Sequence, residues 1–578
     1  MRSLGFDVRV ATDAADAETL LAAVPADQRV AVVDARFVGH VHALRLGLTD
    51  PRFDAAAIPG AVTARPAARP ALTRALRTAS DDASNGSVVV GILAERIAEV
   101  LDTDLHRPEL GELVAEVPRD PQSRNEARQA VTVVDDEAIR LRTAVKSRDG
   151  FFTTYCISPY SRYLARWCAR RGFTPNQVTT ASLITALIAA GCAATGTRAG
   201  YVAAGLLLLF SFVLDCTDGQ LARYSLQYST LGAWLDATFD RAKEYAYYAG
   251  LALGAARGGD DVWALALGAM VLQTCRHVVD FSFNEANHDA TANTSPTAAL
   301  SGRLDSVGWT VWLRRMIVLP IGERWAMIAV LTAVTTPRIT FYVLLIGCAF
   351  AATYTTAGRV LRSLTRKAQR TDRAAQALAD LADSGPLAEL LGRILPSGPR
   401  VVAQLLALAG AVVLVLAAWI DGPGWSVVLC AVVYVLVSAE VVARPLKGAL
   451  DWLVPPLFRA AEYGTVLVLA AKADVNGALP AAFGLVAAVA YHHYDTVYRI
   501  RGNAGAPPHW LVRAIGGHEG RTLLVTVLAA LLTATDFKVA LTALAVAVAL
   551  VVLVESIRFW VTAHKVGAPA VHDEGEPA

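Results

Sequence analysis

The chain has 578 residues, of which 54% are hydrophobic, and its mean hydropathy of +0.41 is above that of an ordinary soluble protein. Its 53 Lys and Arg residues nearly balance 51 Asp and Glu residues, so the net charge of +2 provides no field that would attract nucleic acid. Seven cysteines without a CxxC pair argue against both a zinc site and a disulfide framework. The composition therefore indicates a polytopic membrane protein.

The first part of the chain, residues 1–145, has no long apolar run and is expected to form a soluble α/β domain. Asp7–Ala11 and Val30–Asp34 have the composition of short buried strands, and Ala14–Val24 has helical apolar spacing, which suggests a small doubly wound domain. Ala61–Ala79 is rich in Ala, Arg and Pro and is expected to be exposed loop around one helix. Because the N-terminus has no apolar signal region, we expect this domain to stay in the cytoplasm.

The next part, residues 150–365, is predicted to be an all-α membrane domain. It opens with a basic amphipathic helix that suits the membrane surface. A polar insert, Asn284–Arg315, carries Trp309 and Trp312 near its end, as an interfacial element does. The insert lies between the fourth and fifth of six expected membrane helices, near residues 177–196, 200–222, 230–255, 261–282, 323–336 and 338–361.

The remainder of the chain is predicted to be a polar, partly helical linker (366–400), a second membrane block of about six helices (401–563) and a disordered tail (564–578). The second block has its own polar residues: Arg459, Glu462, His492, His493, Asp495, Arg499, His518, Glu519 and Arg521. They suit either a hydrogen-bonded network that holds helices together or a site for a lipid head group.

Basic residues near the expected helix ends indicate the orientation in the membrane. Arg166–Arg171, Arg223, Arg314–Arg315 and Arg362–Arg370 fall on one side when six helices are threaded alternately. By the positive-inside rule, that side is the cytoplasm. We therefore expect an integral protein of the plasma membrane in which the turn after the second helix faces the cytoplasm.

Four aspartates lie around that turn. The segment from Asp215 to Asp240 reads D-x-x-D-G-x-x-A-R-x8-G-x3-D-x3-D. Asp215 and Asp218 are three residues apart and Asp236 and Asp240 four apart, so each pair shares one helical face. Two antiparallel helices would then bring four carboxylates together, which is costly inside a membrane unless cations are present.

This carboxylate group predicts a site for two Mg²⁺ or Mn²⁺ ions, because these cations prefer oxygen ligands. Two such ions could clamp a pyrophosphate. Gly219, Gly232 and Ala222 leave room for a nucleotide, and Arg223 suits a phosphate. The alternative is a structural cluster in which Arg223, Arg241 and Lys243 only neutralise the aspartates.

The eight specified positions of this segment resemble the signature of the CDP-alcohol phosphotransferase family without a departure. The resemblance covers about residues 150–365. It implies six transmembrane helices, a homodimer, a CDP-activated donor, an alcohol acceptor and release of CMP. It also implies that Asp215, Asp218 and Asp236 bind the metals, and that Asp240 is a fourth ligand or the general base.

The same resemblance implies the nucleotide and acceptor sites. Thr174-Pro175-Asn176 is similar to the family's entry into its first helix, so Asn176 and Thr179 are candidate nucleotide contacts beside those of the signature; a plain helix start explains them equally well. The candidates for holding a phosphorylated polyol acceptor are Lys243, Arg276, Arg315 and Arg324. The open alternative for these four is that they extend their charged ends to the membrane surface or pair with Glu244, Asp280 and Glu323.

The overall layout resembles the bifunctional inositol-phosphate cytidylyltransferase/di-inositol-phosphate-phosphate synthases. The first 60 residues lack the expected Gly-rich nucleotide loop, so the N-terminal domain is expected to be a degenerate nucleotidyltransferase-like or receiver-like module. The leading hypothesis is transfer of a phosphatidyl group from CDP-diacylglycerol to an alcohol, with release of CMP, in phospholipid biosynthesis, because the site is expected at the lipid boundary. The alternatives are a synthase that uses a soluble CDP-polyol such as CDP-inositol, and a transporter or scaffold with a silent motif.

Overall fold

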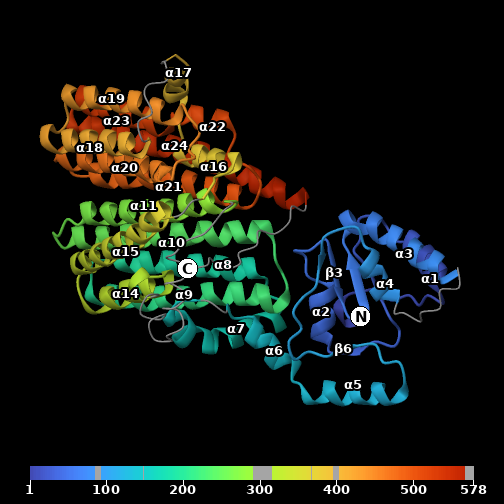
Figure 1. Cartoon of the computed structure of the whole chain (residues 1–578). Coiled ribbons are helices and arrows are strands. Elements are labelled where there is room, and N and C mark those ends of the chain that lie inside the picture. Colours follow the sequence, from blue (N-terminus) through green and yellow to red (C-terminus); the bar gives the residue numbers. More distant parts are fainter. Residues whose placement is uncertain (85–92, 147–148, 291–315, 366–367, 395–402, 567–578) are drawn as a thin grey trace.

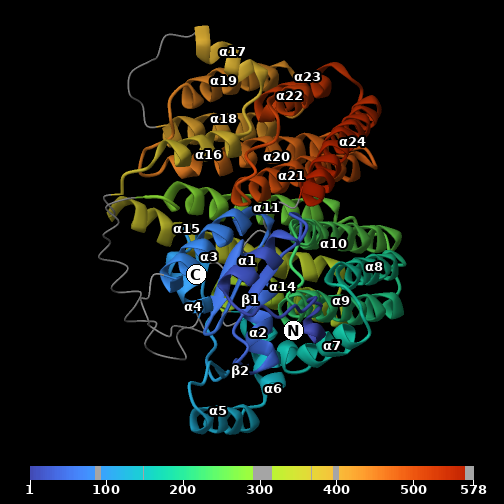
Figure 2. The same cartoon turned by 90° about the vertical axis from the view of Figure 1, so that its right-hand side faces the viewer.

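The computed structural model describes residues 1–84, 93–146, 149–290, 316–365, 368–394 and 403–566. It has a small α/β domain followed by two blocks of helices. The long helices of both blocks run roughly parallel to one another, and the N-terminal domain lies beside one end of them (Figure 1, Figure 2). This arrangement suits one membrane layer that holds both blocks.

The N-terminal domain is built on a short mixed sheet, with strands in the order β1-β4-β3-β5. Strand β4 pairs antiparallel with both β1 and β3, and β3 pairs parallel with β5. The four strands are β1 (Val30–Val33), β3 (Ala55–Ile58), β4 (Ala61–Ala64) and β5 (Leu105–His106). The predicted doubly wound sheet is therefore wrong, because most of these pairs are antiparallel.

Helices and a second small sheet surround this sheet. The helices are η1 (Arg2–Leu4), α1 (Ala14–Ala22), α2 (Val41–Leu48), η2 (Pro66–Ala68), α3 (Arg69–Ser84), α4 (Leu93–Val100), α5 (Pro121–Val133) and α6 (Asp136–Thr143). The second sheet pairs β2 (Val38–Gly39) with β6 (Ala115–Glu116).

Two predictions for this domain are wrong. Asp7–Ala11 forms no strand, and Val10 in it is 81% exposed, so its apolar residues have no sheet to join. Ala61–Ala64, expected as exposed loop, is the buried strand β4. Helices pack on both faces of this strand, so small alanines fit where a half-exposed strand would show alternating large residues.

The first helical block begins with a π-turn, η3 (Thr153–Ile157), and a basic helix, α7 (Ser158–Arg170). Its six long helices are α8 (Pro175–Ala194), α9 (Arg198–Ser225), α10 (Thr230–Arg257), α11 (Trp263–Asn287), α14 (Ile321–Val334) and α15 (Pro337–Thr365). Thr174 and Gln177 form a capping box that starts α8, with Thr174 Oγ1 accepting from the Gln177 amide at 3.3 Å. The six predicted helices are thus present, while most of the insert, including Trp309 and Trp312, lies outside the described residues.

Small residues let the helices of this block approach closely. A Cβ atom added at Gly250 or Gly254 of α10 would overlap the carbonyl oxygens of Ala190 or Ala193 in α8. Such contacts between small residues are typical of membrane helices, where packing replaces the hydrophobic effect. They fix α10 against α8 and so fix the position of the aspartates on α10.

The second block contains two amphipathic helices, α16 (Asp372–Ala382) and α17 (Pro386–Ile394), followed by longer ones. These are α18 (Ala403–Asp421), α19 (Trp425–Val442), η4 (Asp451–Leu453) with α20 (Val454–Lys472), α21 (Ala478–Arg501), α22 (His509–Ala514), α23 (Gly517–Leu531) and α24 (Ala534–Val566). Leu378 and Leu381 of α16 are fully buried, and α16 packs on α11 of the first block and on α20 and α21 of the second. The expected linker therefore contributes two packed helices.

Seven helices among the described residues are long and apolar enough to cross a membrane, judged by length and composition. They are α8, α9, α15, α18, α19, α24 and the segment Asp451–Lys472. About twelve crossings were expected. Other long helices, such as α10 and α11, are less apolar because they carry charged side chains. These helices bury several of those side chains in the protein interior.

Candidate active site

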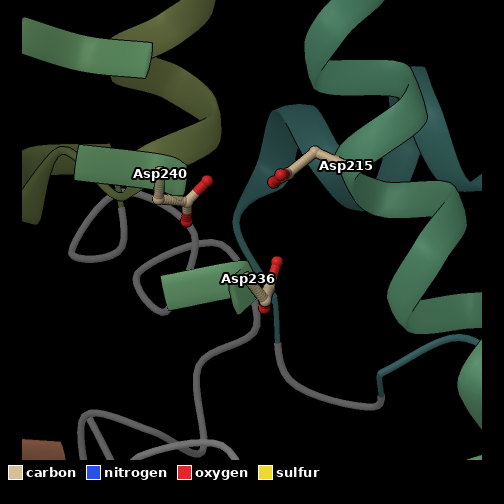
Figure 3. Close-up of side chains that lie close together, drawn as sticks. All are labelled: Asp215, Asp236 and Asp240. Atoms are coloured by element: carbon tan, nitrogen blue, oxygen red, sulfur yellow. The ribbon is translucent and has the colours of Figure 1, made fainter. Parts of the chain in front are cut away.

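The aspartates of the signature lie where α9 ends and α10 begins. Leu226 takes a left-handed conformation (φ 53°) after α9, and Ser229 caps α10 by accepting from the Gly232 amide at 2.9 Å. The short turn makes the two helices antiparallel. Carboxylate oxygens of Asp215, Asp236 and Asp240 lie within 4.8 Å of one another, and the three side chains point toward a common space (Figure 3).

Asp218 lies one turn further along α9 and is only 3% exposed. It is not one of the three grouped carboxylates, but it lines the same cavity, and its Oδ2 has no hydrogen-bond partner. The donor set, made of carboxylate oxygens and including this buried unpartnered atom, fits a hard divalent cation such as Mg²⁺ or Mn²⁺. The four residues predicted as ligands therefore all face one cavity, and metal binding by them stays a prediction.

Lys243 is the cation nearest to this group. Its fully buried ammonium pairs with Asp215, lies 2.9 Å from Asp240 Oδ1 and donates to Ser182 Oγ at 3.2 Å. The other two cations of the structural alternative have different partners: Arg241 pairs with Glu244 and Arg223 donates to the carbonyl of Ala144. One lysine thus bridges two of the four aspartates.

A cavity of 1490 Å³ opens beside the aspartates. All eight signature positions line it, and so do Asn176 and Thr179, the two further nucleotide candidates. A Cβ atom at Gly232 would lie 2.8 Å from Asn176 Oδ1, so a glycine is required there if Asn176 is to keep its place. At Gly219 a side chain would reach toward Arg223, with its nearest atom 3.5 Å away.

Three of the four predicted acceptor residues, Lys243, Arg276 and Arg324, do not line this cavity. Arg324 pairs with Glu244 at 3.2 Å, Arg276 donates to the carbonyl of Val318, and Lys243 bridges the aspartates. Arg315 lies outside the described residues. For these three residues the structure favours the alternative of internal pairing, although the partners of Lys243 and Arg276 differ from those expected.

Other cations line the cavity instead, and they come from four parts of the chain. They are Arg52 and Lys146 of the N-terminal domain, Arg359 and Arg362 of α15, Arg373 of α16 and Arg501 of α21. The sequence carried no local signal for these residues, because their approach to the aspartates depends on how distant elements pack. Arg359 pairs with Asp280, which also lines the cavity.

The N-terminal domain is docked on the turn between α9 and α10. The Arg52 guanidinium lies 4.1 Å from the centre of the Tyr228 ring, and burial raises the pKa of the Tyr228 phenol. Arg140 donates to the carbonyl of Tyr224 at 2.7 Å, and burial lowers the pKa of Arg140 to about 10. The domain thereby closes one side of the cavity.

Comparison with known families decides the nature of the first block. Residues 173–353 match the model of the CDP-alcohol phosphatidyltransferase family. This segment is a CDP-alcohol phosphatidyltransferase domain. The resemblance predicted from the eight signature positions is confirmed, and the phosphotransferase domain includes all four aspartates. Residues 372–578 match a family of unknown function, DUF5941. The matched region begins at α16, inside the segment 366–400 that was expected to be a linker.

Relatives of the phosphotransferase domain include three synthases. The chain is 31% identical over 114 residues to a "Bifunctional IPC transferase and DIPP synthase" of Aquifex aeolicus (20% of this chain, 26% of the relative). It is 32% identical over 130 residues to a phosphatidylinositol phosphate synthase of Streptomyces avermitilis (21% and 51%). It is 29% identical over 113 residues to an archaetidylinositol phosphate synthase of Pyrococcus horikoshii (20% and 58%). The chain thus spans between a quarter and less than two thirds of these relatives.

Proposed function

We propose that the protein transfers the phosphatidyl group of CDP-diacylglycerol to the hydroxyl group of an alcohol and releases CMP. The carrying observation is the group of Asp215, Asp236 and Asp240, whose oxygens lie within 4.8 Å of one another in a cavity lined by all eight signature positions. The site lies at the end of α9, which is long and apolar enough to cross a membrane, so a lipid-linked donor would be able to reach it. The names of two relatives, both lipid phosphate synthases, support a polyol phosphate as the acceptor.

In the proposed reaction, Asp240 accepts the proton of the acceptor hydroxyl. The acceptor oxygen then forms a bond to the phosphorus that carries diacylglycerol, and the bond from that phosphorus to the bridging oxygen breaks. CMP leaves with the bridging oxygen and its electron pair. Two bound Mg²⁺ or Mn²⁺ ions, held by Asp215, Asp218, Asp236 and Asp240, would supply positive charge to the donor phosphates and the leaving group.

We further propose that the protein lies in the plasma membrane with this site at the cytoplasmic face. Support comes from the N-terminal domain, which packs directly on the turn that carries the site. Helix α7, which follows the N-terminal domain in the chain, carries Arg166 and Arg170. Such basic residues favour the cytoplasmic side of a membrane.

The direct test is release of CMP by the purified full chain from radiolabelled CDP-diacylglycerol, with Mg²⁺ and a panel of polyols and polyol phosphates. Asp240→Asn should lower kcat by about 10²–10⁴ because it removes the general base. Asp421→Asn, at the exposed end of α18, is the matched control and should retain activity. Absence of CMP with every donor and acceptor pair would refute the enzyme assignment.

A second candidate donor is a soluble CDP-polyol such as CDP-inositol. The name of the Aquifex aeolicus relative, a transferase fused to a DIPP synthase, favours including it. The same assay distinguishes the two, because only one donor should yield CMP at a useful rate. A transporter with a silent motif would instead show substrate flux that survives loss of the aspartates.

A further inference from the structure

The segment from η4 into the start of α20 repeats the sequence of the part of α10 that carries Asp236 and Asp240. Trp234–Tyr245 reads WLDATFDRAKEY and Trp452–Tyr463 reads WLVPPLFRAAEY. The Trp, Leu, Arg, Ala, Glu and Tyr residues that they share stand at identical spacing. The positions of Asp236 and Asp240 are taken by Val454 and Phe458.

The shared Arg and Glu residues make the same contacts in both blocks. Arg241 pairs with Glu244 at 2.7 Å, and Arg459 pairs with Glu462 at 2.9 Å. In the first block Glu244 also pairs with Arg324 of α14 at 3.2 Å. In the second block Glu462 likewise pairs with an arginine of α23, Arg521, at 2.6 Å. The same buried Arg-Glu-Arg triad therefore occurs twice.

The helices around each triad pack in the same order. In the first block α8 packs on α9 and α10, α9 packs on α14, and α11 packs on α15. In the second block α18 packs in the same way on α19 and α20, α19 on α23, and α21 on α24. The preceding helices correspond as well, because α7 packs on α9 and α17 packs on α19. The preceding helices also share a sequence pattern: Pro159, Leu164 and Arg166 correspond to Pro386, Leu391 and Arg393. Such agreement across the seven matched helix pairs of the two blocks indicates a duplicated fold.

The two blocks also meet as the halves of a symmetric dimer do. Helix α11 packs on α20, α10 packs on α21, and α11 packs on α21. The third helix of each block, α10 or α20, thus contacts the fourth helix of the other block, α21 or α11. This reciprocal pairing is the pattern of an isologous interface. Figure 1 shows the blocks stacked through these helices.

The second block has lost the metal ligands. Ala443-Arg444 at the end of α19 corresponds to Ala222-Arg223 at the end of α9, and this match places Leu436 and Ala439 where Asp215 and Asp218 stand. All four ligand positions are therefore occupied by residues without a carboxylate. The metal-dependent chemistry proposed for the first block therefore has no ligands at the corresponding positions of the second.

The second block nevertheless reaches the catalytic cavity. Tyr498 and Arg501 of α21 and Trp560 of α24 line it. The Trp560 ring stacks on Trp234 at 6.0 Å, two residues before Asp236, and its indole nitrogen donates to Asp495 at 2.6 Å. The second block therefore supplies part of the cavity wall beside Trp234.

We propose that the DUF5941 region is a second copy of the phosphotransferase fold, without metal ligands, that completes the catalytic cavity of the first copy and supplies Arg501 to bind the anionic acceptor. This rests on the proposed function. The nucleotide candidates come from α8, α9 and α10, whereas Arg359, Arg362, Arg373 and Arg501 line the cavity from other elements. A guanidinium there suits a phosphate group on a polyol.

The acceptor role is tested by Arg501→Ala and Arg501→Lys in the full chain. Arg501→Ala should raise the KM for a polyol phosphate at least about tenfold, the effect of one charge-assisted hydrogen bond, with the KM for CDP-diacylglycerol changed less than about twofold. Arg501→Lys should recover part of the loss. Arg558→Ala, on the exposed face of α24, is the control. Equal kinetics of Arg501→Ala and Arg558→Ala would overturn the role.

Two measurements without turnover keep this proposal separate from the proposed function. Inositol 1-phosphate and glycerol 3-phosphate should raise the melting temperature of the wild type but not that of Arg501→Ala, even if no donor releases CMP; equal shifts in both would overturn the role. Mn²⁺ titration should show binding that is lost completely in the double variant Asp215→Asn, Asp240→Asn. Retained binding at undiminished stoichiometry would overturn the absence of a metal site in the second copy.

Discussion

At the scale of single residues, Lys243 has an unusual position for a cation beside an expected metal site. Its buried ammonium pairs with Asp215 and Asp240, two of the carboxylates that we propose as metal ligands. Removing one partner from a buried ion pair leaves uncompensated charge and costs about 3–5 kcal/mol. Lys243 therefore stabilises the aspartate group when no divalent ion is bound.

Lys243→Met should lower the melting temperature of the metal-free protein and make it strongly dependent on Mg²⁺. A bound cation would then supply the missing positive charge, so Mg²⁺ should stabilise the variant more than the wild type. Melting curves with EDTA and with Mg²⁺ measure both effects. Lys472→Met, at the exposed end of α20, is the control, and an equal response to Mg²⁺ in all three proteins would contradict the assignment.

His42 makes the N-terminal domain sensitive to pH. It is 5% exposed, neither ring nitrogen has a hydrogen-bond partner, and burial, with Arg140 and Arg45 nearby, lowers its pKa to about 4. Between about pH 6.5 and pH 4 the unfolded chain binds a proton at this histidine and the folded chain does not. The stability that neutral His42 contributes is present above pH 6.5 and is lost as the pH falls toward 4.

The melting temperature of the wild type should therefore fall more steeply between pH 7 and pH 4.5 than that of His42→Leu. The leucine variant has no group to titrate at this position, so the comparison isolates the histidine. Parallel curves for the two proteins would show that His42 does not carry the effect.

At the scale of elements, α16 and α17 are joined by a buried charged corner. Asp383, in a left-handed conformation (φ 56°), accepts from Arg521 at 2.7 Å and from His492 at 3.1 Å. Glu519 accepts from the amides of Gly385 and Ala388 at 2.9 and 3.1 Å. The polar cluster noted in the sequence thus holds helices together, and the segment expected to be a linker is part of it.

Asp383→Leu should destabilise the second block by about 3–5 kcal/mol, because Arg521 and Arg459 lose a buried counter-charge. Thermal unfolding in detergent measures the loss. Asp380→Leu, three residues earlier on α16 and outside this cluster, is the control and should cost less. Equal losses would mean that the ion pairs at Asp383 contribute little.

How much the sequence predicts also depends on the element. Helical periodicity places each aspartate pair on one face, so the approach of Asp215, Asp236 and Asp240 was predictable from their spacing, while Asp218 lines the same cavity outside this group. Strands β3 and β4 were missed because their alanines pack between helices and show no alternation. The lining cations Arg52, Arg373 and Arg501 were missed because packing between distant segments, rather than local pattern, brings them to the cavity.

At the scale of the whole molecule, the N-terminal domain contacts the turn that carries the aspartates. Arg140 is the centre of this contact, with its guanidinium 3.5 Å from the Tyr224 ring centre and a 2.7 Å hydrogen bond to the Tyr224 carbonyl. Tyr224 in turn donates to Glu137 at 2.8 Å. Docking of this domain should therefore keep the α9–α10 turn in the geometry that the site requires.

Arg140→Ala should lower kcat/KM for the CDP donor about tenfold, as expected for loss of a hydrogen bond to a charged group, and should make the segment near residue 146 more sensitive to protease. Arg142→Ala is the matched control, because its side chain is 67% exposed and its nearest carboxylate oxygen is 3.9 Å away. If the two variants behave alike, the N-terminal domain does not support the site.

The two copies of the fold, marked by the repeated Arg-Glu-Arg triad, affect how this protein can evolve by substitution. In a pair of identical chains every substitution appears twice, once on each side of the axis, so a change that helps one side must be tolerated on the other. Here the two halves are encoded separately, and Val454 and Phe458 could replace aspartates without touching Asp236 and Asp240. One half is free to specialise in shaping the cavity while the other keeps the chemistry.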